Sequence, residues 1–507
     1  MIRSLYRLLP LLLLCLVACS APPRTPPAAV PTAGYTPPDP AIEVTILQMN
    51  DVYEITPVAG GESGGLARVA TLRKRLLEEN PNTLTVMAGD FFSPSALGTA
   101  RVDGERLAGA QMVAVLNALG LDVATFGNHE FDIDREAFYQ RLGESRFQYV
   151  ASNVFDAQGR SFPGTAAHLI WKIPGPRGDT LRLGLVTATI DSNPVEYVRY
   201  APPVERMRAE IERMRGRTDA VIALTHLALE DDIALADSIP ALHLIMGGHE
   251  HENYQLWRGT TLTPITKADA NARTVYVHRL RYDPATRALT VRSNLERITD
   301  AIPDDPAVAA EVERWVDAAF AGFRAQGLKP AQPVVTLPVP LDGREASVRN
   351  RPTNLTDLIA EAMYRAAGAP DLAVFNSGSI RIDDVLPPGT LVEYDVIRVL
   401  PFGGDVLTVT MPGSVLDSVL TIGAGPNQGS GGFLQHHGVT RTAGGWQIQD
   451  RPLDPARTYR VAISDFLVTG LEKNLGFLTL DDPRIAQVAT HGDVRLAVVA
   501  ELKRRYE

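Results

Sequence analysis

The chain has 507 residues, of which 45% are hydrophobic and 21% are charged, so it is long enough for two folded domains and too apolar to be disordered. Its formal net charge of −10 at pH 7 argues against binding of a nucleic-acid polymer, because an acidic protein repels phosphates on average. A small phosphorylated substrate remains compatible with this charge, since local arginines or metal ions can override the average field.

The N-terminal segment predicts export. Arg3 and Arg7 precede the apolar run 8–17, which is shorter than the roughly 20 residues that a membrane-spanning helix needs. Leu16-Val17-Ala18-Cys19 follows and resembles a bacterial lipobox. We therefore predict a lipoprotein signal at 1–18 and a lipid anchor at Cys19, placing the protein on the periplasmic or outer-membrane side. The alternative is an ordinary secretory signal in which Cys19 is incidental.

Residues 19–41 are rich in Pro, Ala and Thr, a composition typical of an extended tether. Between 42 and 303, apolar runs alternate with amphipathic helical patterns. Continuous apolar runs are typical of strands covered on both faces, so this region predicts a layered α/β domain. The predicted strands are 44–49, 83–88, 123–126, 149–152, 181–187, 220–224 and 242–246. The predicted helices are 66–77, 107–119 and 204–215.

A connecting helix is predicted at 304–328. Asp304 and Asp305 provide a capping residue before Pro306, and Gly327 and Pro330 follow its end. Residues 329–507 then predict a second domain, with strands at 373–375, 406–410 and 458–463 and a helix at 356–367 near a capping Asn354.

Residues that can bind metals follow the predicted strands of the first domain. In an open α/β sheet, ligands bind at the carboxyl edge of the strands, so side chains that follow several strands are expected to converge there. Neighbouring glycines would allow the sharp turns that this convergence requires. The residues are Asp51, Asp90, Asn128, His129, Asp132, His226, His249 and His251.

These donors suit two divalent ions. Carboxylates and an Asn carbonyl provide hard oxygen ligands, and imidazoles favour Zn, Mn or Fe. Two such ions can clamp a phosphate, acidify a water and hold the leaving oxygen. The sequence does not choose among the three metals.

The ordered set D…GD…GNHEFD…TH…GHEH resembles the calcineurin-like metallophosphoesterases and, within them, the two-domain bacterial 5′-nucleotidase family. The resemblance implies a four-layer β-sandwich flanked by helices, with a smaller C-terminal α/β domain. It also implies that His129 faces the phosphate and that Asp132 orients His129. It assigns one ion to Asp51, Asp90 and His251, and the other to Asp90, Asn128, His226 and His249, with Asp90 bridging.

The second domain carries further motifs of this family. Arg349 precedes a Thr-Asn element, Asn376 and Arg381 flank Ser-Gly-Ser-Ile, and Phe402 and Phe466 lie in Pro-Phe-Gly and Asp-Phe elements. By this resemblance the arginines bind phosphate or carboxylate oxygens, and the two phenylalanines stack on a nucleobase. The alternative for both phenylalanines is a place in the core.

Two positions depart from the family pattern. The residues after Phe466 lack the Asp that relatives use to bind the nucleoside, and Tyr53 replaces the His of an Asp-x-His element. A tyrosine with a pKa near its usual value of roughly 10 is a costly ligand, so we expect water or substrate to take its place and the first ion to bind more weakly than the second. The alternative is that Tyr53 binds the ion as a phenolate, for which Fe(III) is best suited.

Together these features predict an exported dinuclear-metal phosphohydrolase acting on nucleoside 5′-phosphates or related nucleotides. A 2′,3′-cyclic-nucleotide phosphodiesterase of the same family is one alternative. A nucleotide-binding surface lipoprotein with a weakened metal site is the other.

Overall fold

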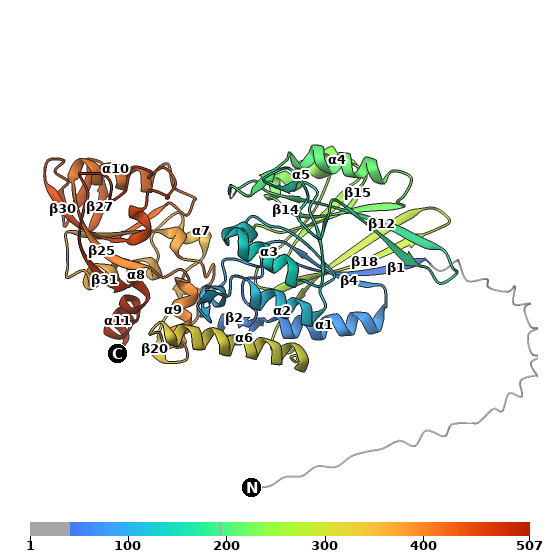
Figure 1. Ribbon diagram of the computed structural model, residues 1–507, viewed down its shortest axis with the longest axis horizontal. Helices are drawn as coiled ribbons and strands as arrows, with labels where there is room; N and C mark the ends of the chain where they lie inside the picture. Colours follow the sequence, from blue (N-terminus) through green and yellow to red (C-terminus); the bar gives the residue numbers. More distant parts are fainter. Residues whose placement is uncertain (1–40, 193) are drawn as a thin grey trace, which may run out of the picture. The chain divides into compact units, whose positions relative to one another are not determined.

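Two stacked β-sheets form the centre of the N-terminal domain in the computed structural model, which describes residues 41–192 and 194–507 (Figure 1). The first sheet has the order β10-β8-β7-β4-β1-β18-β19. Its strands are β1 (Ile42–Met49), β4 (Thr83–Ala88), β7 (Val123–Thr125), β8 (Gln148–Val150), β10 (Thr165–Ala166), β18 (Thr274–Asp283) and β19 (Ala288–Arg297). The predicted signal segment, Cys19 and nearly all of the tether lie outside the described residues.

The second sheet has the order β11-β12-β14-β15-β17-β16. Its strands are β11 (Leu169–Pro174), β12 (Thr180–Thr189), β14 (Ala220–His226), β15 (Leu242–Gly247), β16 (Tyr254–Arg258) and β17 (Thr263–Lys267). All seven predicted strands are present in the two sheets. The sequence did not reveal β10, β11, β16, β17, β18 and β19, which include the antiparallel edges. For example, β19 alternates partly buried and exposed residues and therefore lacks a continuous apolar run.

Alternate side chains of β1 show how the layers are packed. Val44 and Ile46 belong to the core between the sheets, whereas Leu47 and Met49 pack in a different core with the helices. That second core contains residues of α1 (Leu66–Glu79), α2 (Ala110–Leu119), α3 (Arg135–Glu144) and α6 (Pro306–Ala325). The other sheet is covered by α4 (Pro203–Met214) and α5 (Leu229–Ser238). The predicted four-layer sandwich is confirmed.

The predicted connecting helix corresponds to α6. Asp305 caps it by accepting a hydrogen bond from the Val308 N–H at 3.2 Å, as the sequence suggested. Its residues Val308, Ala319 and Phe323 are buried in the core that contains α1 and α2. This helix is therefore an integral part of the packing of the N-terminal domain.

A five-stranded sheet forms the C-terminal domain, in the order β26-β22-β30-β25-β31. The strands are β22 (Leu372–Asn376), β25 (Asp405–Pro412), β26 (Leu434–His437), β30 (Thr458–Ser464) and β31 (Ala486–Asp493). One face packs against α8 (Asn354–Ala366), α9 (Glu393–Val399) and α11 (Val494–Tyr506), and the other against α10 (Gly413–Ala424). The smaller α/β domain is thus confirmed.

The cap of α8 differs from the prediction. Thr353 is the capping residue, and its hydroxyl accepts a hydrogen bond from the Thr356 N–H at 3.3 Å. Asn354 is already helical, and its side-chain oxygen instead accepts from the Asp342 N–H at 2.9 Å. Both residues suit a helix start, so the sequence pattern alone placed the cap one residue too late.

The remaining elements are short. They are β2 (Pro57–Val58), β3 (Ser63–Gly64), β5 (Arg101–Val102), β6 (Glu105–Arg106), β9 (Val154–Asp156), β13 (Val198–Tyr200), β20 (Pro333–Leu337), β21 (Leu341–Asp342), α7 (Glu345–Val348), β23 (Val385–Leu386), β24 (Gly389–Val392), β27 (Val439–Thr442), β28 (Gly445–Ile448) and β29 (Arg451–Pro452). None of the helices in the described residues is both long enough and apolar enough to span a bilayer.

Candidate metal centre

The ends of five strands place the predicted metal-binding residues in one region. Asp51 follows β1, Asp90 follows β4, Asn128 follows β7, His226 ends β14, and His249 and His251 follow β15. Four of them have left-handed backbone conformations, with φ values of 52° at Asp51, 57° at Asp90, 90° at His249 and 58° at His251. Such conformations are strained for residues other than glycine and persist where the surrounding structure imposes them, often at functional sites.

Two glycines make the close approach of these turns possible. A Cβ atom at Gly127 would lie 2.0 Å from the Asp90 Oδ1, and one at Gly248 would lie 2.6 Å from the Ala88 carbonyl oxygen. Neither contact is sterically possible. The glycines that follow the strands are therefore required for the packing of the turns, as the sequence suggested.

Four of the predicted ligands lie within a few ångströms of one another. His226 Nε2 is 3.2 Å from Asp90 Oδ2 and 3.9 Å from Asp51 Oδ1, and His251 Nε2 is 3.6 Å from Asp51 Oδ1. Asp51, Asp90 and His226 are essentially inaccessible to solvent. Carboxylate and imidazole donors at these separations are suited to a cation.

The hydrogen bonds of His226 and Asn128 leave two buried acceptors for such a cation. His226 donates its Nδ1–H to the Ala88 carbonyl at 2.8 Å, so its Nε2 lone pair faces the carboxylates. Among the described residues, neither His226 Nε2 nor the side-chain oxygen of Asn128 has a hydrogen-bond partner. A buried amide oxygen without a donor, and a buried imidazole nitrogen that faces two carboxylates, are costly without positive charge. These residues therefore fit a divalent ion.

Electrostatics support this interpretation. Burial lowers the pKa of His226, but Asp90 and Asp51 outweigh it and raise the pKa to about 10. A metal-free cluster would thus retain a proton, which a bound ion would displace. Burial, aided by the charge of His226, lowers the pKa of His249 to about 3 and keeps this second imidazole neutral. His249 is also held in place, since its backbone N–H donates to Asp51 Oδ2 at 2.9 Å.

Tyr53 occupies the middle of the cluster, which the sequence did not predict. Its hydroxyl lies 2.9 Å from His251 Nε2, 3.2 Å from Asp90 Oδ2 and 3.4 Å from Asp51 Oδ1. Burial and the two carboxylates raise the pKa of Tyr53 well above its usual value. The hydroxyl therefore lies among the residues predicted to hold the first ion.

His129 and Asp132 form the predicted pair beside the cluster. His129 Nδ1 lies 2.6 Å from Asp132 Oδ2, and the His129 N–H donates to Asp90 Oδ1 at 2.8 Å. Burial lowers the pKa of His129, but Asp90 and Asp132 reverse this effect and raise it above 6.5. Asp132 therefore orients the imidazole, and the backbone of His129 is fixed to the turn that carries Asp90.

Glu130 has a structural role at this site that the sequence analysis missed. Its Oε1 accepts from the N–H groups of Phe91 and Phe92 at 2.6 and 3.1 Å, and its Oε2 accepts from those of Asp90 and Gly127 at 2.8 and 2.5 Å. One buried carboxylate thus joins the turn after β4 to the turn after β7. The motif contained Glu130, but only the tertiary structure shows its donors.

Lys267 is a second missed residue, at the end of β17. Its fully buried ammonium donates to the carbonyl oxygens of Leu227 and Gly248 at 2.6 and 2.7 Å and is 2.9 Å from Asp232 Oδ2. Leu227 follows His226 and Gly248 precedes His249, so Lys267 connects the two loops that carry histidine ligands. A single lysine in an apolar strand gives no sequence signal for this role.

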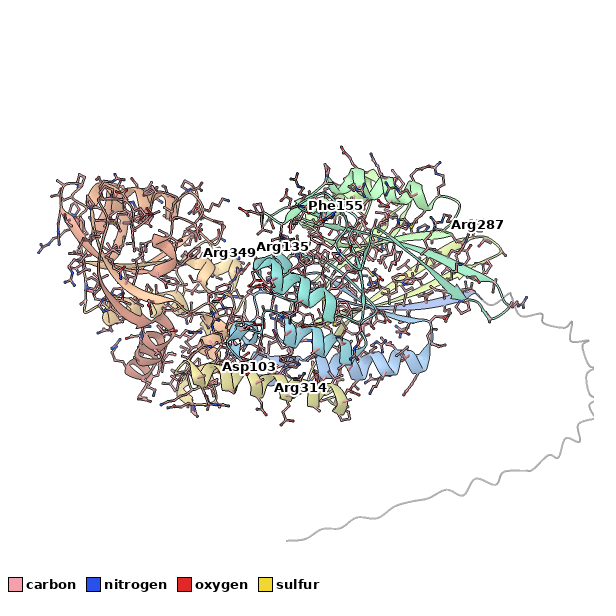
Figure 2. The ribbon with its side chains drawn as sticks, viewed as in Figure 1. Asp103, Arg135, Phe155, Arg287, Arg314 and Arg349 are labelled. Atoms are coloured by element: carbon pink, nitrogen blue, oxygen red, sulfur yellow. The ribbon has the colours of Figure 1, made fainter. Side chains whose placement is uncertain are left out.

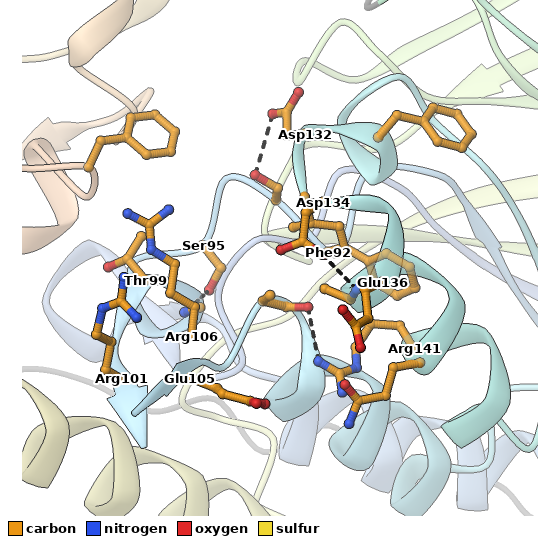
Figure 3. A pocket seen from close by; sticks show the side chains of 18 of the residues that line it. Phe92, Ser95, Thr99, Arg101, Glu105, Arg106, Asp132, Asp134, Glu136 and Arg141 are labelled. Carbon is orange, nitrogen blue, oxygen red and sulfur yellow. Dashed lines mark hydrogen bonds between the residues drawn. The ribbon is translucent and has the colours of Figure 1, made fainter. Parts of the chain in front are cut away.

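Phe402 and Arg381 lie on the His129 side of the site. The Arg381 guanidinium is 5.7 Å from the centre of the Phe402 ring, and its Nη2 is 4.0 Å from Asp132 Oδ2. Phe402 and Asp132 line a cavity of about 910 Å³, whose wall also carries Arg106 (Figure 3). Since 48% of the Phe402 side chain is exposed, the core alternative does not apply to it.

Arg349 and Asn376 have different surroundings. Arg349, labelled in Figure 2, follows α7 and pairs with Glu345. It lines a groove of about 1080 Å³ together with His249 and His251. Asn376 is buried and donates to Glu472 Oε2 at 2.8 Å. Its side chain is thus already engaged within the C-terminal domain. The predicted substrate residues therefore do not all line one cavity.

Phe402 and Phe466 are predicted to hold a nucleobase between them, and both rings are exposed. Phe466 is 41% exposed, and within residues 41–192 and 194–507 no ring contact joins it to Phe402. Both rings are therefore accessible to a flat ligand without touching each other. A nucleobase held between them stays a prediction.

Comparison with known proteins identifies the family. Residues 44–253 match the model of the calcineurin-like phosphoesterases, and residues 333–479 match that of the 5′-nucleotidase C-terminal domain. The chain belongs to the two-domain 5′-nucleotidase family. It is similar to the 5′-nucleotidase of Bos taurus, with 25% identity covering 90% of this chain and 87% of that protein, and to protein UshA of Yersinia enterocolitica, with 26% identity covering 85% and 86%.

The fold has a close counterpart among solved structures. A 5′-nucleotidase precursor from Thermus thermophilus superimposes with a TM-score of 0.72 and 22% identity over 91% of this chain and 96% of that one. This 5′-nucleotidase family member is a metal-dependent phosphoric ester hydrolase.

Proposed function

We propose that this family member is an exported enzyme that uses two divalent ions to remove phosphate from nucleoside 5′-monophosphates. When bound, the ions supply positive charge that polarises the phosphate and lowers the pKa of the attacking water. Asp51, Asp90 and His251 would hold one ion, and Asp90, Asn128, His226 and His249 the other. The buried cluster of Asp51, Asp90 and His226 carries this proposal, because its carboxylate oxygens and imidazole nitrogen lie 3.2 to 3.9 Å apart and are inaccessible to solvent.

His129 is the catalytic residue of the proposal. Asp132 keeps the His129 ring oriented. The backbone N–H of His129 donates a hydrogen bond to Asp90, which fixes the distance between the imidazole and the metal cluster. A protonated His129 stabilises charge on the phosphoryl oxygens and assists departure of the nucleoside oxygen. The raised pKa of His129 favours the protonated form that this role needs.

Arg381 and Phe402 are proposed to position the nucleotide. The Arg381 Nε–H has no hydrogen-bond partner among the described residues, so a donor remains for a substrate oxygen. Phe402 presents an exposed aromatic face in the same region. Arg349 contributes a second guanidinium at the His251 side, while Asn376 and Phe466 complete the predicted substrate set.

Export and anchoring belong to the same proposal. They are supported by the basic and apolar signal segment, by the lipobox ending in Cys19 and by the Pro-rich segment that follows. Hydrolysis of nucleotides outside the cytoplasm would release nucleosides for uptake. Labelling of cells with a radioactive fatty acid tests the anchor, and the absence of label in the intact protein would contradict it.

The catalytic role is tested by exchanging His129 for Ala. We expect His129→Ala to retain its metal content and to lose phosphate release from adenosine 5′-monophosphate. His168→Ala is a matched control, because His168 also pairs with a carboxylate, Glu210, at 2.9 Å, and neither residue belongs to the predicted site. Equal activity of the two variants would refute the assignment. Activity on 2′,3′-cyclic nucleotides alone would refute the substrate class.

A further inference from the structure

A hydrogen bond joins the C-terminal domain to a predicted metal ligand. Asp383 Oδ2 lies 2.6 Å from His251 Nδ1, although the two residues are 132 positions apart in the sequence. His251 follows β15 of the N-terminal domain, whereas Asp383 lies between β22 and β23 of the C-terminal domain. The contact is partly buried, since the two side chains are 14% and 20% exposed.

Asp383 is held firmly in the position that makes this contact. Its other oxygen, Oδ1, accepts from the Glu345 N–H at 2.7 Å, so both carboxylate oxygens are engaged. The preceding residue, Ile382, is buried in the core of the C-terminal domain. Asp383 also has a positive φ of 38°, a conformation that a surrounding structure must impose.

The hydrogen bond to Asp383 sets the tautomer of His251 and the direction of its ring at the metal centre. A carboxylate accepts, so His251 donates its Nδ1–H to Asp383 and keeps the lone pair on Nε2. This Nε2 faces Tyr53 Oη at 2.9 Å and Asp51 Oδ1 at 3.6 Å. A carboxylate behind a ligating imidazole sets its tautomer and ring orientation and makes it a better donor.

Two further polar contacts between the domains, among the described residues, involve no predicted metal ligand. Arg273 Nη1 is 3.5 Å from Asp384 Oδ1, and Tyr394 donates to Glu54 Oε2 at 3.2 Å. These contacts can hold the domains together, but they leave the imidazoles untouched. Asp383 therefore differs from its neighbour Asp384, although both join the same two domains.

We propose that Asp383 is a positioning residue of the metal centre, through which the C-terminal domain sets the affinity of the site that contains His251. The inference rests on the proposed function for the identity of that site. Coupling between two equilibria is reciprocal, so an ion bound at His251 also stabilises the contact between the domains. The nucleotide domain would thus contribute to the metal centre as well as to substrate binding.

Zinc titration by calorimetry tests the proposal with Asp383→Asn and the control Asp384→Asn in the full chain stripped of metal. Asparagine tolerates a positive φ, so the variant is expected to fold. We expect Asp383→Asn to weaken one of the two zinc sites about 10-fold to 100-fold, the range typical for such partners of a metal-bound histidine. Asp384→Asn, which removes only a charge between the domains, should bind zinc as the unaltered protein does.

A second variant, Asp383→Ala, removes the acceptor entirely and should weaken the same site at least as much. Unchanged zinc affinity in Asp383→Asn, or an equal loss in Asp384→Asn, would overturn the proposal. Because the readout is metal binding, it is independent of hydrolysis. A protein that hydrolyses no nucleotide but shows the selective loss would contradict the proposed function and leave the role of Asp383 supported.

Discussion

Replacement of Glu130 by Gln should destabilise the N-terminal domain strongly. Each carboxylate oxygen accepts from two backbone N–H groups, so an amide in either orientation turns its NH₂ group toward two of these donors. Leaving a buried donor without an acceptor costs about 1–3 kcal/mol, and two such donors cost about 2–6 kcal/mol. For a domain of this size, a loss of 2 kcal/mol corresponds to a fall in Tm of about 4 °C.

Thermal unfolding at pH 8 measures this effect. Burial, with Asp90 as a second cause, raises the pKa of Glu130 to about 7, so the carboxyl is ionised at the chosen pH. Glu136→Gln serves as the control, because Glu136 is an exposed carboxylate on α3 that the same exchange makes neutral. If Glu130→Gln lowers Tm no more than this control, the four hydrogen bonds do not hold the two turns as described.

Two further predictions concern Tyr53 and His278. Titration of zinc into stripped protein should show two sites of unequal affinity. Tyr53→His should bring the two affinities closer together, because the imidazole replaces a weak ligand. Two equally tight sites in the unaltered protein would contradict this prediction. His278 is buried between Gln48 and Ser293, and burial lowers its pKa to about 3. As the folded-state pKa lies below the unfolded value of 6.5, stability is lost as the pH falls below 6.5, by about 2 kcal/mol at pH 5. The Tm of the unaltered protein should therefore fall more steeply between pH 7 and pH 5 than that of His278→Gln, and parallel curves would refute the assignment.

The sequence predicted the strands that carry the ligands because their apolar runs are continuous and end in polar residues. Asp51 and Asp90 could be placed together for this reason, since the carboxyl ends of neighbouring parallel strands share one edge. His226 ends β14 of the second sheet, so its place beside them follows from the stacking of the two sheets. The antiparallel strands β18 and β19 were missed because their partly exposed residues interrupt the apolar pattern.

The residues that support the ligands could not be predicted in the same way. Glu130, Lys267 and Asp383 act through partners that are defined only by the tertiary fold, such as backbone amides, carbonyls or a histidine from another domain. Tyr53 was recognised as a departure from the family, but its position inside the cluster follows from the packing of the turn after β1. Asn376 was assigned to substrate from its motif, whereas its bond to Glu472 depends on a contact across 96 residues.

The most direct test of the central claim is phosphate release from adenosine 5′-monophosphate by protein stripped with a chelator and then supplied with divalent metal. We predict no release from the stripped protein and recovery of release as the ions bind, with two ions per chain at full activity. Release that persists without metal would contradict the account, and so would a protein that binds two ions and releases no phosphate.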